Sequence, residues 1–334
     1  MELQRKGLQL GAAMLICAVL LRLLGSGLPE KAVAFFSDER IMAGILFLQT
    51  GRVIRPMENL AEEEPAATQA TQPAEPAPTA PEEPVLAVFG EADAALVEVN
   101  SVCGYGADLP ALLQQPLHWD LTGQAPTVLI VHTHGTESYT KTEDYTESSA
   151  YRTLDEQYNV VSVGDRLEKL LEEGGVQVVH DRTMHDYPSY NDSYNQARES
   201  IQAYLKEYPT IRLVLDIHRD SVTDGDGRQL RFVAQSQGQT AAQLMLVVGT
   251  DASGLSHPHW PENMSLAVKL HALLEKNFPG LCRPISFRSQ RFNQDLSPGA
   301  LIVEVGSAGN TRQEALAAVE QLAKAVLELA RGTG

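Results

Sequence analysis

The chain has 334 residues, which is long enough for two ordinary domains. Its 43 acidic residues outnumber the 26 basic ones, and the net charge of -17 argues against nucleic acid as a partner, because phosphate binding needs a basic face. The 3 cysteines are too few for a disulfide framework and lack the spacing of a structural zinc site.

An apolar run at residues 10–24 follows two basic residues and is interrupted by Arg22. The run is short, because a membrane-spanning helix needs about 20 apolar residues. Arg22 lies near its far end, where a long side chain can reach the interface. We expect residues 1–27 to form a cytoplasmic tip and an uncleaved single-pass anchor, with the rest of the chain outside. A cleaved signal peptide is the alternative, although residues 25–27 lack a clear Ala-x-Ala site.

The composition changes twice between this run and the rest of the chain. Residues 28–60 contain a second apolar segment that is too short to span a membrane, and we interpret them as a juxtamembrane helical segment. Residues 61–84 consist only of Ala, Glu, Pro, Thr and Gln. Such a segment cannot bury enough apolar surface to fold, so it is predicted to be a disordered spacer. The globular domain is therefore expected at residues 85–334.

Within that domain, strands alternate with helices. A buried strand is predicted at 127–132, followed by a polar loop at 138–157. Asn159 is a good N-cap for the next helix, which Gly174 and Gly175 end. The remaining predicted elements are strands at 176–179, 211–218, 229–235, 244–249 and 301–305, and helices at 195–208, 261–278 and 312–331.

This order is typical of an α/β fold with a mostly parallel sheet and helices on both faces. The strands at 229–235 and 244–249 are predicted to form an antiparallel pair. Polar residues stand at three strand ends, and in a parallel sheet these ends meet at one edge, where ligands bind. The residues at these ends are His132, His134 and Glu137, then Asp216, His218, Arg219 and Asp220, and finally Glu304.

This combination of residue types indicates a hydrolytic zinc site. Zinc takes three His or carboxylate ligands and keeps a fourth position for water. We assign His134, Glu137 and His218 as ligands. Glu304 is assigned as the base that moves the proton of the bound water, because a charged residue in a buried strand is otherwise costly.

Two other readings stay open at this edge. His132 is the rival of His134, and since it lies nearer the sheet we expect it to support the ligands or to face the substrate. Each residue alone also has an ordinary explanation, such as a hydrogen-bonded histidine, a helix cap, or an ion pair between Glu304 and Arg219.

Six segments, in this order and spacing, resemble the stage II sporulation protein P family over roughly residues 90–330. They are residues 132–139, 186–191, 214–220, 248–251, 259–263 and 301–306. The resemblance implies a membrane-anchored zinc hydrolase of endospore-forming bacteria, similar in fold to zinc N-acetylmuramoyl-L-alanine amidases. It implies peptidoglycan as the substrate, with cleavage of the amide between N-acetylmuramic acid and L-alanine and also of stem-peptide crosslinks. It further implies action between the septal membranes during engulfment, with stage II sporulation proteins D and M as partners.

Carried over residue by residue, the resemblance matches His134, His218 and Glu304. The carboxylate ligand stays open between Glu137 and the later pair Asp155 and Glu156. Zinc and Arg219 are expected to hold the oxyanion.

We expect three residues to bind substrate carboxylates, since arginine pairs them bidentately. They are Arg288, Arg291 and Asn293. Two alternative functions remain: a carboxypeptidase-type zinc peptidase on the same fold, and a non-catalytic wall-binding scaffold.

Overall fold

The computed structural model describes residues 86–148 and 150–333. The predicted anchor, juxtamembrane segment and spacer lie outside the described residues. Among the helices that the structure does describe, none is both long and apolar enough to span a membrane.

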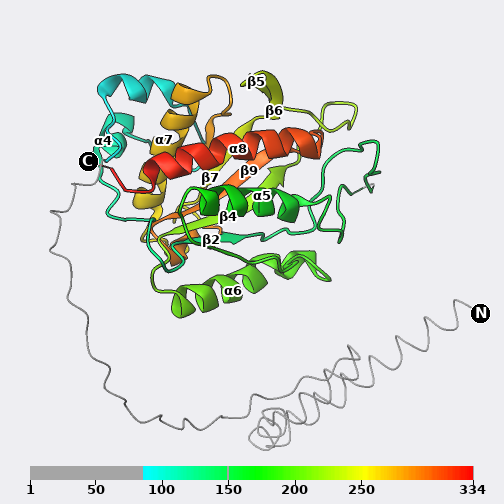
Figure 1. The fold of residues 1–334 in the computed structure, drawn as a ribbon, viewed down its shortest axis with the longest axis horizontal. Helices are drawn as coiled ribbons and strands as arrows, with labels where there is room; N and C mark the ends of the chain where they lie inside the picture. The colour runs from blue at the N-terminus through cyan, green and yellow to red at the C-terminus, as the bar shows by residue number, and fades with distance from the viewer. Residues whose placement is uncertain (1–85, 149, 334) are drawn as a thin grey trace, which may run out of the picture. The chain divides into compact units, whose positions relative to one another are not determined.

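A seven-stranded sheet forms the centre of the domain (Figure 1). Its order is β1 (Val99–Ser101), β8 (Ile285–Phe287), β7 (Leu244–Val248), β9 (Ala300–Ser307), β4 (Leu213–Asp220), β2 (Val128–Val131) and β3 (Val178–His180). Every neighbouring pair is parallel except β7 and β9. The predicted mostly parallel sheet is confirmed.

The predicted antiparallel pair is wrong in its members. β5 (Val233–Ser236) pairs with β6 (Gln239–Ala242) in a separate hairpin. Gln237 and Gly238 join these strands, both with positive φ, which is the backbone of a tight two-residue hairpin turn. β7 instead enters the main sheet antiparallel to β9, where most of its residues are buried.

Helices cover both faces of the sheet, as predicted. Figure 1 shows α5 (Val160–Glu173), α7 (Trp260–Asn277) and α8 (Arg312–Leu329) on one side and α6 (Ser193–Glu207) on the other. The alternation along β2 serves both layers: Ile130 belongs to the large core under α5 and α8, whereas Leu129 packs in the smaller core with Ile201 of α6. Short helices complete the domain: η1 (Glu91–Leu96), α4 (Leu109–Gln114), η2 (Tyr190–Asp192) and η3 (Gln294–Leu296).

The helix ends follow local sequence signals. The Asn159 side chain accepts a hydrogen bond from Val161 N at 3.0 Å, and α5 ends before Gly174. Thr311 and Glu314 form a capping box at the start of α8. At the opposite end of α8 the chain returns to its first described residues, because Ala87 and Thr333 form a parallel bridge and Ala87 N donates to Gly332 O.

Candidate metal centre

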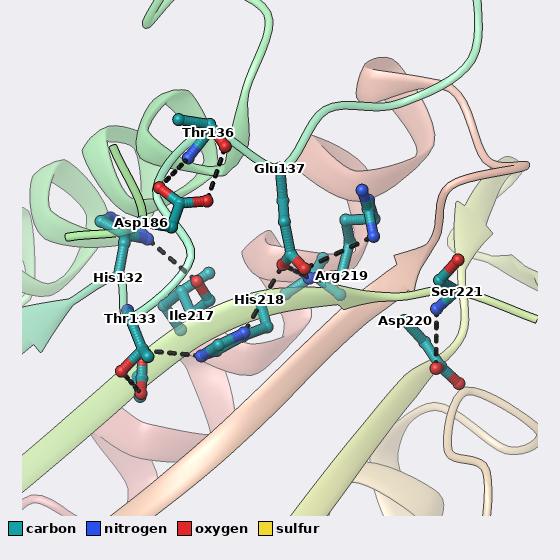
Figure 2. Close-up of polar contacts among 12 residues, drawn as sticks. His132, Thr133, Thr136, Glu137, Asp186, Ile217, His218, Arg219, Asp220 and Ser221 are labelled. Atoms are coloured by element: carbon teal, nitrogen blue, oxygen red, sulfur yellow. Dashed lines mark hydrogen bonds and ion pairs between the residues drawn. The ribbon is translucent and has the colours of Figure 1, made fainter. Parts of the chain in front are cut away.

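The carboxyl ends of β2, β4 and β9 lie side by side, which brings the predicted residues to one edge of the sheet. Val131 of β2 pairs with Asp216 of β4, and His218 of β4 pairs with Glu304 of β9. Figure 2 shows Glu137 pointing from the turn after β2 toward His218 and Arg219 on β4. Asp220 lies apart from them, since its carboxylate pairs with Arg283 at 2.8 Å.

Buried Asp216 fixes the turn that carries the histidines. It accepts hydrogen bonds from Thr133 N at 2.8 Å and from Thr133 Oγ1 at 2.6 Å. Burial alone would raise the pKa of Asp216, but the neighbouring His218 and the Thr133 hydrogen bonds bring it below its usual value. The turn between His132 and His134 is thus tied to an anion on the next strand.

Glu137 and His218 meet in a buried, charged contact. His218 Nδ1 lies 3.5 Å from Glu137 Oε2, and Arg219 Nη1 donates to Glu137 Oε1 at 3.4 Å. Burial opposes the charge on Glu137, yet Arg219 and His218 lower its pKa to about 2. Burial likewise opposes protonation of His218, and Asp216 and Glu137 nevertheless raise its pKa well above the usual value. The site therefore presents a carboxylate anion that favours a positive charge beside it.

Three buried side-chain atoms at this edge have no hydrogen-bond partner among the described residues. They are His134 Nδ1, His218 Nε2 and Glu304 Oε2. His218 Nε2 nevertheless lies 2.9 Å from Asp216 Oδ1, which is an ion-pair distance, so only His134 Nδ1 and Glu304 Oε2 count as unpaired here. An unpaired buried polar atom costs about 1–3 kcal/mol. The unpaired His134 nitrogen, the His218 imidazole and the anionic Glu137 carboxylate together match the donor set that zinc prefers.

The predicted ligands His134, Glu137 and His218 lie near one another, but their donor atoms are not all close enough together to bind one metal ion. The rings of His134 and His218 are perpendicular, with centroids 5.3 Å apart. One group among the described residues has ligand atoms all within 4.8 Å of one another, and it is a different one: Asp165, Glu168 and His180. Arg182 already donates to both carboxylates of that group, so the positive charge beside them is the Arg182 guanidinium. Side-chain rotation is needed before His134, Glu137 and His218 enclose a metal.

Glu304 has the position and the environment of a proton-transfer group. It is partly buried on β9 next to His218, and its Oε2 is inaccessible. Burial raises its pKa to about 8. A carboxyl group with a pKa near neutrality can both accept and release a proton.

Two predicted site residues contact other parts of the protein. His132 is fully buried: its Nδ1 lies 2.9 Å from Ile217 O and its Nε2 lies 2.8 Å from His180 Nε2, so neither nitrogen is free for a substrate. Arg219 is expected to hold an oxyanion, but its side chain ties down the loop after β2, donating to Ser138 O at 2.9 Å and to Tyr151 O at 2.7 Å. These contacts favour the supporting role for His132 over the substrate-facing one.

The two alternative carboxylates lie elsewhere. Asp155 and Glu156 are exposed, and Asp155 Oδ1 accepts a hydrogen bond from Gln157 N in a local turn. Glu137 is buried and reaches His218. The geometry favours Glu137.

A cavity of about 280 Å³ opens beside His134. Its lining comprises Tyr194, Asn195, Arg198, Ser253, Leu255, Gln290, Arg291, Phe292 and Asn293. The edge of the Tyr194 ring contacts the His134 ring at 5.6 Å between centroids. Of the three predicted substrate residues, Arg291 and Asn293 line this cavity and Arg288 does not.

Sequence reasoning gave no role to the residues that hold His134. The ring of Tyr190 stacks on His134 with centroids 4.6 Å apart, and Arg152 lies over the other face of Tyr190. The segment 186–191 carries part of the family resemblance, but nothing in its sequence shows which side chain faces the site. No pattern pointed to Arg152.

The family model described as stage II sporulation protein P matches residues 49–327. The chain belongs to this family. A curated member, stage II sporulation protein P of Bacillus subtilis (strain 168), is 30% identical over 209 residues, which is 58% of this chain and 48% of that protein. The matched part thus spans about half of the length of that relative.

The solved structures found to be similar include N-acetylmuramoyl-L-alanine amidases. N-acetylmuramoyl-L-alanine amidase AmiC2 of Nostoc punctiforme is 14% identical with a TM-score of 0.36, over 61% of this chain and 97% of that one. The CwlD amidase of Clostridioides difficile, solved in complex with the GerS lipoprotein, is 13% identical with a TM-score of 0.34, over 60% of this chain and 94% of that one.

Proposed function

We propose that this member of the stage II sporulation protein P family is a zinc-dependent peptidoglycan hydrolase of sporulation. Its proposed reaction is hydrolysis of the amide between N-acetylmuramic acid and L-alanine. One observation carries the proposal: the side chains of His134, His218 and Glu304 gather at the adjacent ends of β2, β4 and β9, and buried His134 Nδ1 and Glu304 Oε2 have no hydrogen-bond partner among the described residues.

His134, Glu137 and His218 would hold the metal. Oxygen Oε1 of Glu137 faces Arg219 and Arg152, whereas Oε2 lies nearer His218 Nδ1. Glu137 would therefore present Oε2 toward the metal, although Oε2 also accepts a hydrogen bond from Arg219 N at 3.2 Å. Zinc held in this way supplies a hydroxide-like nucleophile at neutral pH and polarises the amide carbonyl.

Glu304 handles the proton. Its carboxylate accepts the proton that the attacking water loses, and then delivers it to the amide nitrogen as the C–N bond breaks. The products are a free carboxylate on the lactyl side and a free amino group on L-alanine. Because burial raises the pKa of Glu304 to about 8, the protonated form that serves the leaving amine is accessible near neutral pH.

The cavity beside His134 is proposed to bind the stem peptide. Arg198 pairs bidentately with Asp295 at 2.9 and 2.7 Å, so its charge is already balanced. Arg291 has two long contacts through Nη1, with Asp295 at 3.5 Å and with Ser256 O at 3.4 Å, and is the better partner for a stem-peptide carboxylate. Asn293 donates to Tyr194 O at 2.7 Å, so it holds the cavity wall and is less free for substrate.

The cellular setting is proposed from the family and from the N-terminal sequence. The apolar run at 10–24 would anchor the chain in the membrane, with the hydrolase domain outside the cytoplasm, between the septal membranes. Stage II sporulation proteins D and M are the proposed partners.

Digestion of purified peptidoglycan sacculi, followed by mass spectrometry of the muropeptides, tests the reaction. The zinc-loaded protein should release stem peptides with free L-alanine amino termini, and metal removal should stop the release. Products cleaved only within the stem peptide would favour the peptidase alternative. Binding of sacculi without any cleavage would overturn the enzymatic proposal in favour of a scaffold.

A further inference from the structure

Arg152 contacts one of the proposed zinc ligands directly and a second one through Tyr190. It belongs to the polar loop after β2, and its backbone forms an antiparallel bridge with Glu137. Its Nη2 is 3.7 Å from Glu137 Oε1. The guanidinium thus lies on the side of the carboxylate that faces away from His218, since Oε2 is the oxygen 3.5 Å from that ring.

The same guanidinium also acts on His134, through Tyr190. Its Cζ is 4.5 Å from the centroid of the Tyr190 ring. The opposite partner of that ring is His134, stacked at 4.6 Å with an interplanar angle of 15°. Tyr190 is 52% exposed, so packing from the protein interior does not fix its ring. The layers Arg152, Tyr190 and His134 fix one another.

A buried carboxylate holds Arg152 in this place. Asp186 accepts hydrogen bonds from Arg152 Nη1, from Thr136 N at 3.1 Å and from Thr136 Oγ1 at 2.6 Å. Thr136 stands between His134 and Glu137 in the chain, so Asp186 ties Arg152 to the turn that carries both ligands. Hydrogen bonding at the edge of a planar group and stacking on its face are possible together for arginine but not for lysine.

We propose that Arg152 is a positioning residue that sets two of the three zinc ligands at once. It directs the carboxylate of Glu137 by charge and the ring plane of His134 by stacking through Tyr190. The inference rests on the proposed zinc site. Residues that orient metal ligands typically change metal affinity or activity 10–100-fold when they are replaced.

The test is the zinc dissociation constant of the full chain, measured by competition with a chromogenic chelator. Arg152→Met and Arg152→Lys should each weaken zinc binding about 10–100-fold. Tyr190→Ala should weaken it in the same direction, and Tyr190→Phe, which keeps the ring, should restore the parent affinity. Arg228→Met is the matched control, because Arg228 also pairs with two carboxylates, Asp224 and Asp226, but none of its contacts involves the three ligands.

Thermal melting of the metal-free proteins separates positioning from unfolding, and the variants should melt within a few degrees of the parent. Asp186→Asn, which removes the carboxylate that holds Arg152 but leaves Arg152 in the chain, should lower zinc affinity as well. If Arg152→Met does not fold, Arg152→Lys and Asp186→Asn carry the same test. Parent-like zinc affinity in the folded variants overturns the inference. A parent protein that binds no zinc overturns the proposed function instead.

Discussion

His218 and Glu304 face each other across neighbouring parallel strands, at paired positions of β4 and β9. This register puts a proposed metal ligand and a proposed proton carrier on rigid backbone, without a loop between them. Groups held on adjacent strands keep their spacing better than groups on loops, and catalysis is sensitive to displacements of about 1 Å. Metal binding by His218 and proton transfer by Glu304 can therefore be tested separately, by replacing one residue while the other stays in place.

Glu304→Gln should abolish most hydrolysis and leave zinc binding intact. The amide keeps the size of the side chain but cannot take up a proton, and loss of a general base costs about 10²–10⁴-fold in rate. The turnover of sacculi and the zinc content of the purified variant are the two measurements. Glu320→Gln, which changes a surface ion pair with Arg166, is the control. Parent-like hydrolysis by Glu304→Gln would refute the proton role.

His134→Ala and His218→Ala should lose zinc and activity together. Each removes the imidazole of one of the proposed ligands, and an alanine side chain offers no donor atom to the metal. Chelation of the parent should give the same loss, and added zinc should reverse it in the parent only. The exposed His118 offers a control, as His118→Ala should keep full zinc content. Zinc retained at one equivalent in both ligand variants would place the metal elsewhere.

Arg291→Ala should raise KM more than it lowers kcat. A hydrogen bond to a charged group contributes about 1.5–3 kcal/mol, so its loss corresponds to about 10–100-fold in kcat/KM. Steady-state kinetics on soluble muropeptides would show this. Arg288→Ala is the comparison, since Arg288 is exposed and does not line the cavity. Equal effects from both arginines would mean that the cavity is not the peptide site.

Gly164→Ala should destabilise the domain through the His132 and His180 pair. A Cβ at position 164 would lie 2.7 Å from Nε2 of each histidine. Such overpacking costs about 1–3 kcal/mol, part of which the better helix propensity of alanine offsets. We expect the melting temperature to fall by about 2–8 °C. Gly225→Ala, where no atom lies within 4 Å of the added carbon, should change it little.

Asp181 should contribute to stability in a pH-dependent way. Burial opposes its charge, but the neighbouring His185 and Thr183 lower its pKa to about 2. Because the folded-state pKa is lowered, the stabilisation is complete above about pH 4 and is lost as the pH falls toward 2. Between these values the parent should lose about 1–2 kcal/mol that Asp181→Asn does not lose, as measured by urea unfolding. The exposed Asp226→Asn should follow the parent curve.

The fold follows from signals that are local in the sequence. The four apolar residues of β2 and the Asn159 cap mark elements that the structure reproduces. The β5–β6 hairpin escapes this reasoning, since Gln237 is unusual in a turn with positive φ. The antiparallel joint between β7 and β9 is a pairing between distant segments, which a hydrophobic pattern does not specify.

The sequence predicts those site residues whose position is determined by the end of a strand. His134, His218 and Glu304 reach one edge because the strands beside them are recognisable. The orientation of His132 and Arg219 depends on partners elsewhere in the fold, namely His180 and the carbonyls of Ser138 and Tyr151. The proposed role of Arg152 could not be predicted for the same reason, since it depends on contacts with residues far from it in the chain.

The bridge between Ala87 and Thr333 makes the two ends of the described domain near neighbours in space. A short linker can therefore join them, and new ends can be opened in the exposed turn at residues 224–228. Such a circular permutant would keep every strand of the site in register while moving the point of attachment to another face. The orientation in which the domain is presented to its substrate could then be varied independently of its chemistry.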